Sequence, residues 1–261
     1  MIEHLSISQL NLHRKNPRRY CLEYFEKIKL PPTPQLLFGT QVHWYLEHYI
    51  GPCDYPFNRQ SELSTDNKFI LEAAFCNQRN CHKGQDWRLE EEFRIFIDPE
   101  LPPFKGAIDR WKYNPVECIV RVRDYKTTTP GYEETEESLL DNWQLNLYAY
   151  VLSGMLPVGT DIEIEVGHDQ IFKTKDLKIT DVKFISNKLT QKHMHDIIKE
   201  IKEEAFEVLE TYKLYKQGGL EAIRETPENR WWYGKPCPYW KCIKGEESIE
   251  DLRKRIDELN R

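Results

Sequence analysis

Two aspartates and a lysine near the middle of the chain have the types and spacing that divalent-metal chemistry requires. Asp109 ends an apolar run, and Asp124 and Lys126 lie two residues apart at the end of a second run. Residues two apart in an extended strand point to the same face, so this carboxylate and this ammonium would lie side by side. Carboxylate oxygens are ligands that Mg²⁺ and Mn²⁺ accept, and an ammonium can stabilise charge on a reacting group. The pattern therefore predicts a metal-assisted reaction at Asp109, Asp124 and Lys126.

A β-hairpin would bring these residues together. The two apolar runs of residues 106–126 flank the turn signal Asn114-Pro115, a pattern typical of two antiparallel strands. The alternating residues 89–97 predict a preceding strand. Because Glu91 and Glu92 enter that strand, we expect one of them to point toward the hairpin carboxylates.

Two helices offer further candidates. His43 lies on a predicted helix over residues 36–49, and Gln144 and Tyr148 lie one turn apart on a helix that ends near Leu152. A lone histidine on a helix is more often structural than a ligand. The pair Gln144 and Tyr148, taken alone, indicates ordinary helix surface and core.

The remaining elements complete a layered α/β pattern. We expect a helix over residues 21–28, a strand over 161–167, two strands within 170–185, a long amphipathic helix over 189–215 and a charged helix over 248–259. The fold class is α/β (α+β), with a central mixed β-sheet flanked by helices. We expect one domain over residues 1–261, in which N-terminal helices (1–50) and a cysteine-containing C-terminal segment (230–261) pack on a core formed by residues 60–215.

Composition narrows the functional class. Hydrophobic residues make up 39% of the chain, which is enough for a core, and no apolar run is long enough to cross a bilayer. Because the N-terminal residues lack a basic region followed by an apolar block, we expect no signal peptide. The formal net charge of −6 argues against a coat-like nucleic-acid binder, although an enzyme with a local basic groove remains open. The basic run that contains Arg18 and Arg19 indicates either phosphate contact or a solvated face.

The cysteines indicate a reducing compartment. Their number is seven, which is odd, and they are scattered, so a cytoplasmic location fits better than a secreted disulfide framework. Cys237 and Cys242 leave open a zinc-binding interaction module.

Four short motifs, taken together, resemble one family. They are F-G-T-Q-V-H ending at His43, G-A-I-D ending at Asp109, D-Y-K-T over residues 124–127 and Q-L-N-L-Y over residues 144–148. In this order, over about residues 5–245, the chain resembles the RecB-like branch of the PD-(D/E)XK nucleases. Within that branch it is similar to single-domain exonucleases related to CRISPR-adaptation nucleases and their phage counterparts. The resemblance implies a restriction-endonuclease-like core and a single nuclease domain.

The resemblance also implies a role for each matched residue. His43, Asp109 and Asp124 would bind the metal, together with the backbone carbonyl of Tyr125. Lys126 would position or polarise the attacking water and act with Asp109 and Asp124 in catalysis. Two carboxylates suit Mg²⁺ or Mn²⁺, and the added imidazole favours Mn²⁺.

The nucleic-acid contacts follow from the same resemblance. Gln144 and Tyr148 would contact DNA or support the site, and Arg18 and Arg19 would contact phosphates.

The chain departs from the family at its cysteines. Many relatives hold an iron–sulfur cluster on one early cysteine, just before a Pro-Arg pair, and three late ones. Here Asn16 takes the early position, and the cysteines near the expected places are Cys21, Cys237 and Cys242. A fourth thiolate would have to come from Cys53, Cys76 or Cys81. The incomplete pattern favours a protein without a cluster, in which residues 236–240 pack against the Cys21 helix.

The expected function is therefore a divalent-metal-dependent DNA nuclease, and we expect an exonuclease in preference to an endonuclease. It would act on single strands or DNA ends in recombination, repair, replication or phage DNA processing. It would work alone, as a homo-oligomer or within a larger recombination or replication complex, without a membrane. Its place would be the cytoplasm, or the host-cell cytoplasm if a phage encodes it. The alternative is a non-catalytic DNA-binding or assembly subunit that retains the fold.

Overall fold

The structure is a computed structural model that divides into two compact units. It describes residues 2–49, 62–76, 87–156, 162–224, 231–232 and 235–259. The helical unit comprises Met1–Pro32, Ile95–Lys105 and Glu200–Arg261, and the sheet unit comprises Thr33–Arg94 and Gly106–Lys199. The expected packing of the terminal segments on the core stays a prediction.

The sheet unit is built on five strands in the order β1-β2-β3-β4-β5. Their bounds are β1 Arg88–Ile95, β2 Phe104–Asn114, β3 Ile119–Thr128, β4 Glu163–Lys173 and β5 Ile179–Leu189. The pairs β2–β3 and β4–β5 are antiparallel, whereas β3 and β4 run parallel. The predicted mixed sheet and the hairpin around Asn114-Pro115 are thereby confirmed.

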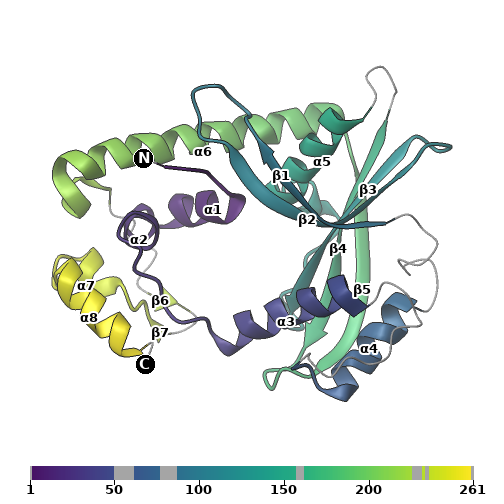
Figure 1. The fold of residues 1–261 in the computed structure, drawn as a ribbon, viewed down its shortest axis with the longest axis horizontal. Helices are drawn as coiled ribbons and strands as arrows, with labels where there is room; N and C mark the ends of the chain where they lie inside the picture. The colour runs from purple at the N-terminus through teal and green to yellow at the C-terminus, as the bar shows by residue number, and fades with distance from the viewer. Residues whose placement is uncertain are drawn as a thin grey trace. The chain divides into compact units, whose positions relative to one another are not determined.

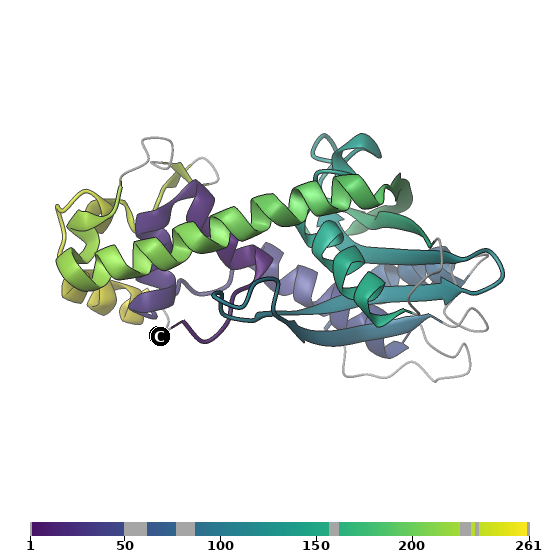
Figure 2. The ribbon, with the colours of Figure 1, turned by 90° about the horizontal axis from the view of Figure 1, so that it is seen from above.

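Helices cover both faces of this sheet (Figures 1 and 2). Helices α3 (Pro34–Tyr49) and α4 (Thr65–Cys76) lie on one face, and α5 (Trp143–Met155) lies on the other. The first turns of α6 (Gln191–Gly218) join α5, since Ser153 and Met194 are in contact. The core under α3 and α4 consists of Phe38, Val42, Tyr45, Leu46, Leu63, Leu71, Phe75, Tyr125, Ile171 and Ile179.

Strand β3 shows how sequence alternation sorts the two faces. Val120 and Val122 are buried on the α5 side, whereas Tyr125 packs into the core under α3 and α4. Asp124 and Lys126 therefore share the α5 face. The spacing that defined the predicted site thus places its carboxylate and its ammonium where α5 can reach them.

A buried ion pair ties β2 to β4. Arg110 and Asp169 are both fully buried, with Nη2 and Oδ2 2.5 Å apart. The Arg110 guanidinium also lies 4.5 Å from the centre of the Trp87 ring. A charge in this setting is tolerated because its partner and the surrounding aromatic rings replace water.

The strands after α5 differ from the expectation. Instead of a strand over residues 161–167 and two strands within 170–185, the chain forms the single hairpin of β4 and β5, with its turn at residues 174–178. The polar residues His168 and Gln170 break the apolar alternation and obscured the continuity of β4. Both are buried on the face that carries Asp124 and Lys126.

The helical unit consists mainly of short helices around the remainder of α6. They are α1 (Ile7–Lys15), α2 (Pro17–Tyr20), the π-helix η1 (Cys21–Phe25), the 3₁₀ helix η3 (Gly219–Ala222), α7 (Trp240–Ile243) and α8 (Ile249–Leu259). The short 3₁₀ helix η2 (Glu137–Leu139) belongs to the sheet unit. A two-stranded ladder joins β6 (Trp231–Trp232) and β7 (Lys235–Pro236). The helix expected over residues 21–28 is thus only a short π-helical stretch. Across the described residues, no helix combines the length and apolarity needed to cross a membrane.

One glycine in the sheet unit provides a test of this packing. The Arg123 guanidinium occupies the space beside Gly167 and donates to the Ile185 carbonyl, at 2.7 Å. A Cβ at Gly167 would collide with both groups, so we expect Gly167→Ala to lower the free energy of unfolding by about 1–3 kcal/mol or more. The measurement is urea denaturation followed by circular dichroism.

The matched control is Gly154→Ala in α5, where a Cβ has no neighbour within 4 Å. Replacing a helical glycine at an open position is expected to stabilise by up to about 1 kcal/mol. Equal stability of the two variants would contradict the packing around Gly167.

Candidate metal centre

The centre is organised where the β2–β3 ladder ends. The paired residues run from Asn114 with Ile119 to Arg110 with Arg123. At the next position the Asp109 carboxylate accepts the backbone N–H of Tyr125, with Oδ2 and N 2.6 Å apart. A side chain thus replaces a strand partner, which satisfies a buried donor and fixes the carboxylate between the strands.

Three potential ligands meet at this point. One atom each of His43 on α3, Glu90 on β1 and Asp109 on β2 lie within 4.8 Å of one another. The Nδ1 atom of His43 is 3.5 Å from Oδ2 of Asp109. An imidazole and two carboxylates form a donor set that suits a divalent cation such as Mn²⁺ or Mg²⁺.

The charges of this group also favour the binding of a cation. Burial and the nearby charge of Asp124 raise the pKa of Asp109 well above its usual range. Burial, Glu47 and Asp124 raise the pKa of Glu90 to about 7. Negative charge is therefore concentrated here at a cost that a bound cation would relieve.

The imidazole of His43 is suited to metal binding in its protonation state. Burial lowers its pKa, and the opposing attraction of Asp124 does not outweigh this effect. A neutral imidazole keeps a ring nitrogen lone pair available to a metal. A lone helical histidine is more often structural, but the position of His43 beside Asp109 favours a role as a metal ligand.

Glu90 is the residue that sequence reasoning missed. The expectation pointed to Glu91 or Glu92, but Glu92 is exposed, and Glu90 joins His43 and Asp109. Its φ is +48°, a left-handed conformation that is uncommon for a residue with a Cβ. Because this backbone breaks the strict alternation of the strand, counting along the strand could not identify which of the three consecutive glutamates faces the centre.

Asp124 and Lys126 form the adjacent half of the site. Their Oδ2 and Nζ atoms are 2.7 Å apart. From α5, Gln144 bridges them: its Nε2 donates to Asp124 Oδ1 at 2.8 Å, and its Oε1 accepts from Lys126 Nζ at 3.0 Å. Gln144 also lies 2.7 Å from the hydroxyl of Tyr148. In this structure both residues support the site from within.

The lysine is held in its charged form. Burial by itself lowers the pKa of Lys126, but the charge and the hydrogen bond of Asp124 outweigh it and raise the pKa above its usual value. Lys126 therefore presents an ammonium, which can donate to or stabilise a negative oxygen but cannot accept a proton.

Tyr125 contributes through its backbone. Its side chain is buried and meets the His43 ring edge-on, with ring centroids 5.5 Å apart. A hydrogen bond between His43 and the Tyr125 backbone also acts on the imidazole. Metal binding by the Tyr125 carbonyl stays a prediction.

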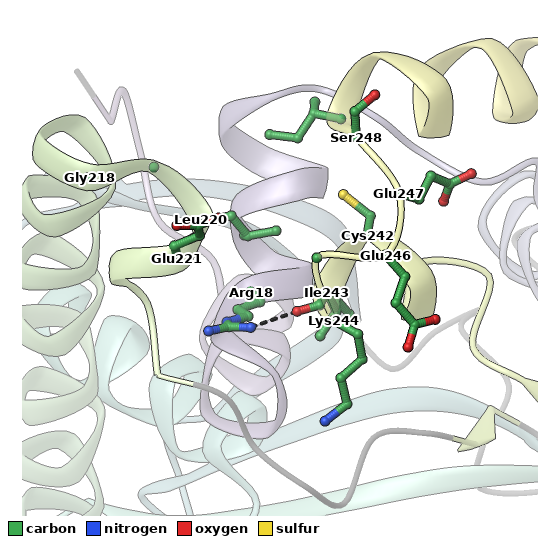
Figure 3. A pocket seen from close by; sticks show the side chains of 13 residues that line it. Arg18, Gly218, Leu220, Glu221, Cys242, Ile243, Lys244, Glu246, Glu247 and Ser248 are labelled. Atoms are coloured by element: carbon green, nitrogen blue, oxygen red, sulfur yellow. Dashed lines mark hydrogen bonds between the residues drawn. The ribbon is translucent and has the colours of Figure 1, made fainter.

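The two N-terminal arginines have structural partners in the helical unit. Arg18 donates to the carbonyls of Ile223 and Ile243, at 2.8 and 2.6 Å, and lines a cavity of about 680 Å³ (Figure 3). Arg19 donates to Glu23 at 2.6 Å. The role of Arg18 and Arg19 in phosphate binding therefore stays a prediction.

The three candidate cluster cysteines are free and buried. Burial raises the pKa of Cys21 to about 12 and that of Cys242 to about 11, and it also raises that of Cys237. Among the described residues, the one group of three or more His, Cys, Asp or Glu ligand atoms within 4.8 Å of one another is that of His43, Glu90 and Asp109. The three thiols therefore do not form such a group in the described part of the chain. Cys53 and Cys81 lie outside the described residues, as does the side chain of Cys76.

The C-terminal segment is anchored near Cys21 by hydrogen bonds. The Tyr239 hydroxyl donates to the Ile28 carbonyl at 3.1 Å and accepts the Leu30 N–H at 3.2 Å. Cys237 and Cys242 belong to the same apolar cluster as Leu22.

Comparison with solved structures supports the fold. A presumed exonuclease from Eubacterium rectale has a TM-score of 0.57 and 13% sequence identity, with 94% of this chain and 88% of that chain covered. The crystal structure of SSO0001 has a lower TM-score of 0.39 and 15% sequence identity, with 78% of this chain and 76% of that chain covered. No curated protein matches the chain.

The family model supplies the assignment. The model of the PD-(D/E)XK nuclease superfamily matches residues 4–242, a range that includes every residue of the centre described above. The mixed sheet with helices on both faces agrees with that family. The chain therefore belongs to the PD-(D/E)XK nuclease superfamily.

Proposed function

We propose that this nuclease is a divalent-metal-dependent deoxyribonuclease, and more specifically an exonuclease. The observation that carries the proposal is the convergence of His43, Glu90 and Asp109 beside an ammonium that Asp124 and Gln144 hold in place. PD-(D/E)XK nucleases use divalent metals, and the ligand set here accommodates Mn²⁺ or Mg²⁺.

The protein groups divide the work of phosphodiester hydrolysis. His43, Glu90, Asp109 and Asp124 would hold a divalent cation, which would supply Lewis acidity and lower the pKa of a bound water. Lys126 lies beside them with its proton on Nζ, where it can stabilise negative charge on the phosphate oxygens. Gln144 keeps this ammonium oriented, because it accepts one of its hydrogen bonds.

DNA ends and single strands are the substrates we propose. The name of the Eubacterium rectale protein and the resemblance of the motifs to single-domain exonucleases support action at ends. The proposed setting is recombination, repair, replication or phage DNA processing in a cytoplasm. The protein would act alone, as a homo-oligomer or as a subunit of a larger complex.

The direct test is digestion of end-labelled linear DNA and of circular DNA, single- and double-stranded, with Mn²⁺, with Mg²⁺ and with a chelator. We expect metal-dependent release of short products from linear DNA and no cleavage of closed circles. Cleavage of circles would replace the exonuclease assignment with an endonuclease. Binding of DNA without cleavage under either metal would favour the non-catalytic alternative.

Substitution of the ammonium tests the assigned site. We expect Lys126→Ala to reduce the rate of DNA cleavage about 10²–10³-fold, because one positioned donor to the developing charge is lost. Asp109→Asn, which keeps the shape of the side chain, is expected to have an effect at least as large, because it removes a metal ligand. The measurement is the initial rate on a labelled oligonucleotide with Mn²⁺.

The matched control is Lys175→Ala, which removes a lysine from the exposed turn between β4 and β5. Its rate should equal that of the unmodified protein. If Lys126→Ala or Asp109→Asn retains full Mn²⁺-dependent activity, the site is assigned incorrectly.

The raised carboxylate pKa values predict how metal binding depends on pH. The pKa of Glu90 rises from 4.5 to about 7 in the folded state, so the stability it contributes is present below about pH 4.5 and is lost as the pH rises through about 7. We therefore expect the metal-free melting temperature to fall over this range. The increase in melting temperature caused by Mn²⁺ should become larger as the pH rises, because protons and metal compete for the same oxygens.

The measurement is a series of thermal melts between about pH 5 and pH 8, with Mn²⁺ or with a chelator. Glu90→Gln removes the titrating group, so this variant should show a flatter metal-free profile and a smaller response to Mn²⁺. A Mn²⁺ effect that is independent of pH would argue against binding at these carboxylates.

A further inference from the structure

A fully buried histidine lies beside the site, with one ring nitrogen directed toward the Asp124 carboxylate. His168 on β4 pairs with Asp124 in the parallel ladder, so the two side chains point to the same face of the sheet. Its Nε2 atom is 3.8 Å from Asp124 Oδ2, and its Nδ1 atom is 2.8 Å from Glu134 Oε2. One imidazole ring thus lies between a carboxylate of the site and a second carboxylate behind it.

The second carboxylate is itself held in place. Gln170, which pairs with Lys126 across the same ladder, accepts the Glu134 N–H and donates to the Glu134 carbonyl, both at 2.9 Å. This amide is buried, so the two bonds fix the backbone of Glu134 against β4. His168 and Gln170, two residues apart on the same face of β4, therefore both lie against the segment that carries Glu134.

We propose that His168 is a positioning residue which, held by Glu134, fixes the Asp124 carboxylate for metal binding and for its contact with Lys126. Its role rests on the proposed function, because Asp124 is a metal ligand only in that proposal. Carboxylates that bind metals are commonly oriented by a further layer of polar groups. His168 completes such a layer, since Gln144 contacts one oxygen of Asp124, while Lys126 and His168 face the other.

Packing alone does not account for this residue. A buried imidazole loses its hydration at both nitrogens, a cost that an apolar side chain of similar size would avoid. At His168 this cost is accompanied by the placement of both ring nitrogens toward carboxylates, those of Asp124 and Glu134. Glu134 also acts on the site through its charge, which contributes to the raised pKa of Lys126.

The test measures Mn²⁺ binding to the full chain by calorimetry, without DNA. We expect His168→Leu to raise the Kd for Mn²⁺ about 10–100-fold, the range found when outer-layer partners of metal ligands are lost. His168→Gln places a polar nitrogen near the position of Nε2, toward Asp124. His168→Asn places one near Nδ1, toward Glu134. If orientation of Asp124 is the role, His168→Gln should bind Mn²⁺ more tightly than His168→Asn.

A second pair of variants keeps His168 intact. Glu134→Gln is also expected to raise the Kd for Mn²⁺, because it removes the carboxylate charge that holds His168. The Glu134 side chain is 40% exposed, so folding should tolerate the change. Glu133→Gln is the matched control: Glu133 lies on the same segment but accepts the Gly131 N–H. If Glu134 acts through His168, the double variant H168L/E134Q should be no weaker than H168L.

The outcomes separate this role from the proposed function. A folded H168L variant with the Kd of the unmodified protein overturns the proposal, and if H168L melts below the assay temperature, an unchanged Kd for E134Q does so. Cleavage is assayed separately. Unmodified protein that binds Mn²⁺ without cutting DNA would contradict the deoxyribonuclease proposal. The Kd values of the variants would still test whether His168 positions Asp124. Unmodified protein that binds no Mn²⁺ overturns both.

Discussion

The hydrogen bond between the Asp109 carboxylate and the Tyr125 N–H is the contact on which the site depends. It lies where the β2–β3 ladder ends, so the next backbone donor of β3 is satisfied by a side chain and not by a strand. This arrangement fixes a buried carboxylate within the sheet, where His43 from one face and the residues of β1 can reach it. A conventional ladder at this position would leave no room for a ligand between the strands.

Charge balance explains the rest of the arrangement. Burial concentrates the carboxylates of Glu90, Asp109 and Asp124 beside the ammonium of Lys126. Such a group is unfavourable without a cation, as the raised pKa values of Glu90 and Asp109 indicate. The structure thus gives up local stability in order to hold ligands at a place that a divalent metal can occupy.

The parallel pairing of β3 with β4 adds a further layer behind the carboxylates. Because His168 and Gln170 lie opposite Asp124 and Lys126, the polar character of the site extends into a strand that an apolar alternation would otherwise define. This is also why β4 was expected as separate pieces. His168 and Gln170 face α5 and the site, where burial is compatible with hydrogen bonds, whereas Asp169 and Ile171 point to the opposite face, which α3 and α4 cover.

The sequence by itself determined the hairpin, the mixed sheet with flanking helices and the family, because alternation, turn residues and motif order are local properties. It also singled out His43, Asp109 and Lys126. Only the tertiary structure decided that Glu90 joins the ligand group, since a left-handed backbone at that residue breaks the counting of faces along β1. In the same way, contacts between distant strands and helices decided that Gln144 orients Lys126 and that His168 faces Asp124, because spacing along a chain does not record which buried polar groups meet.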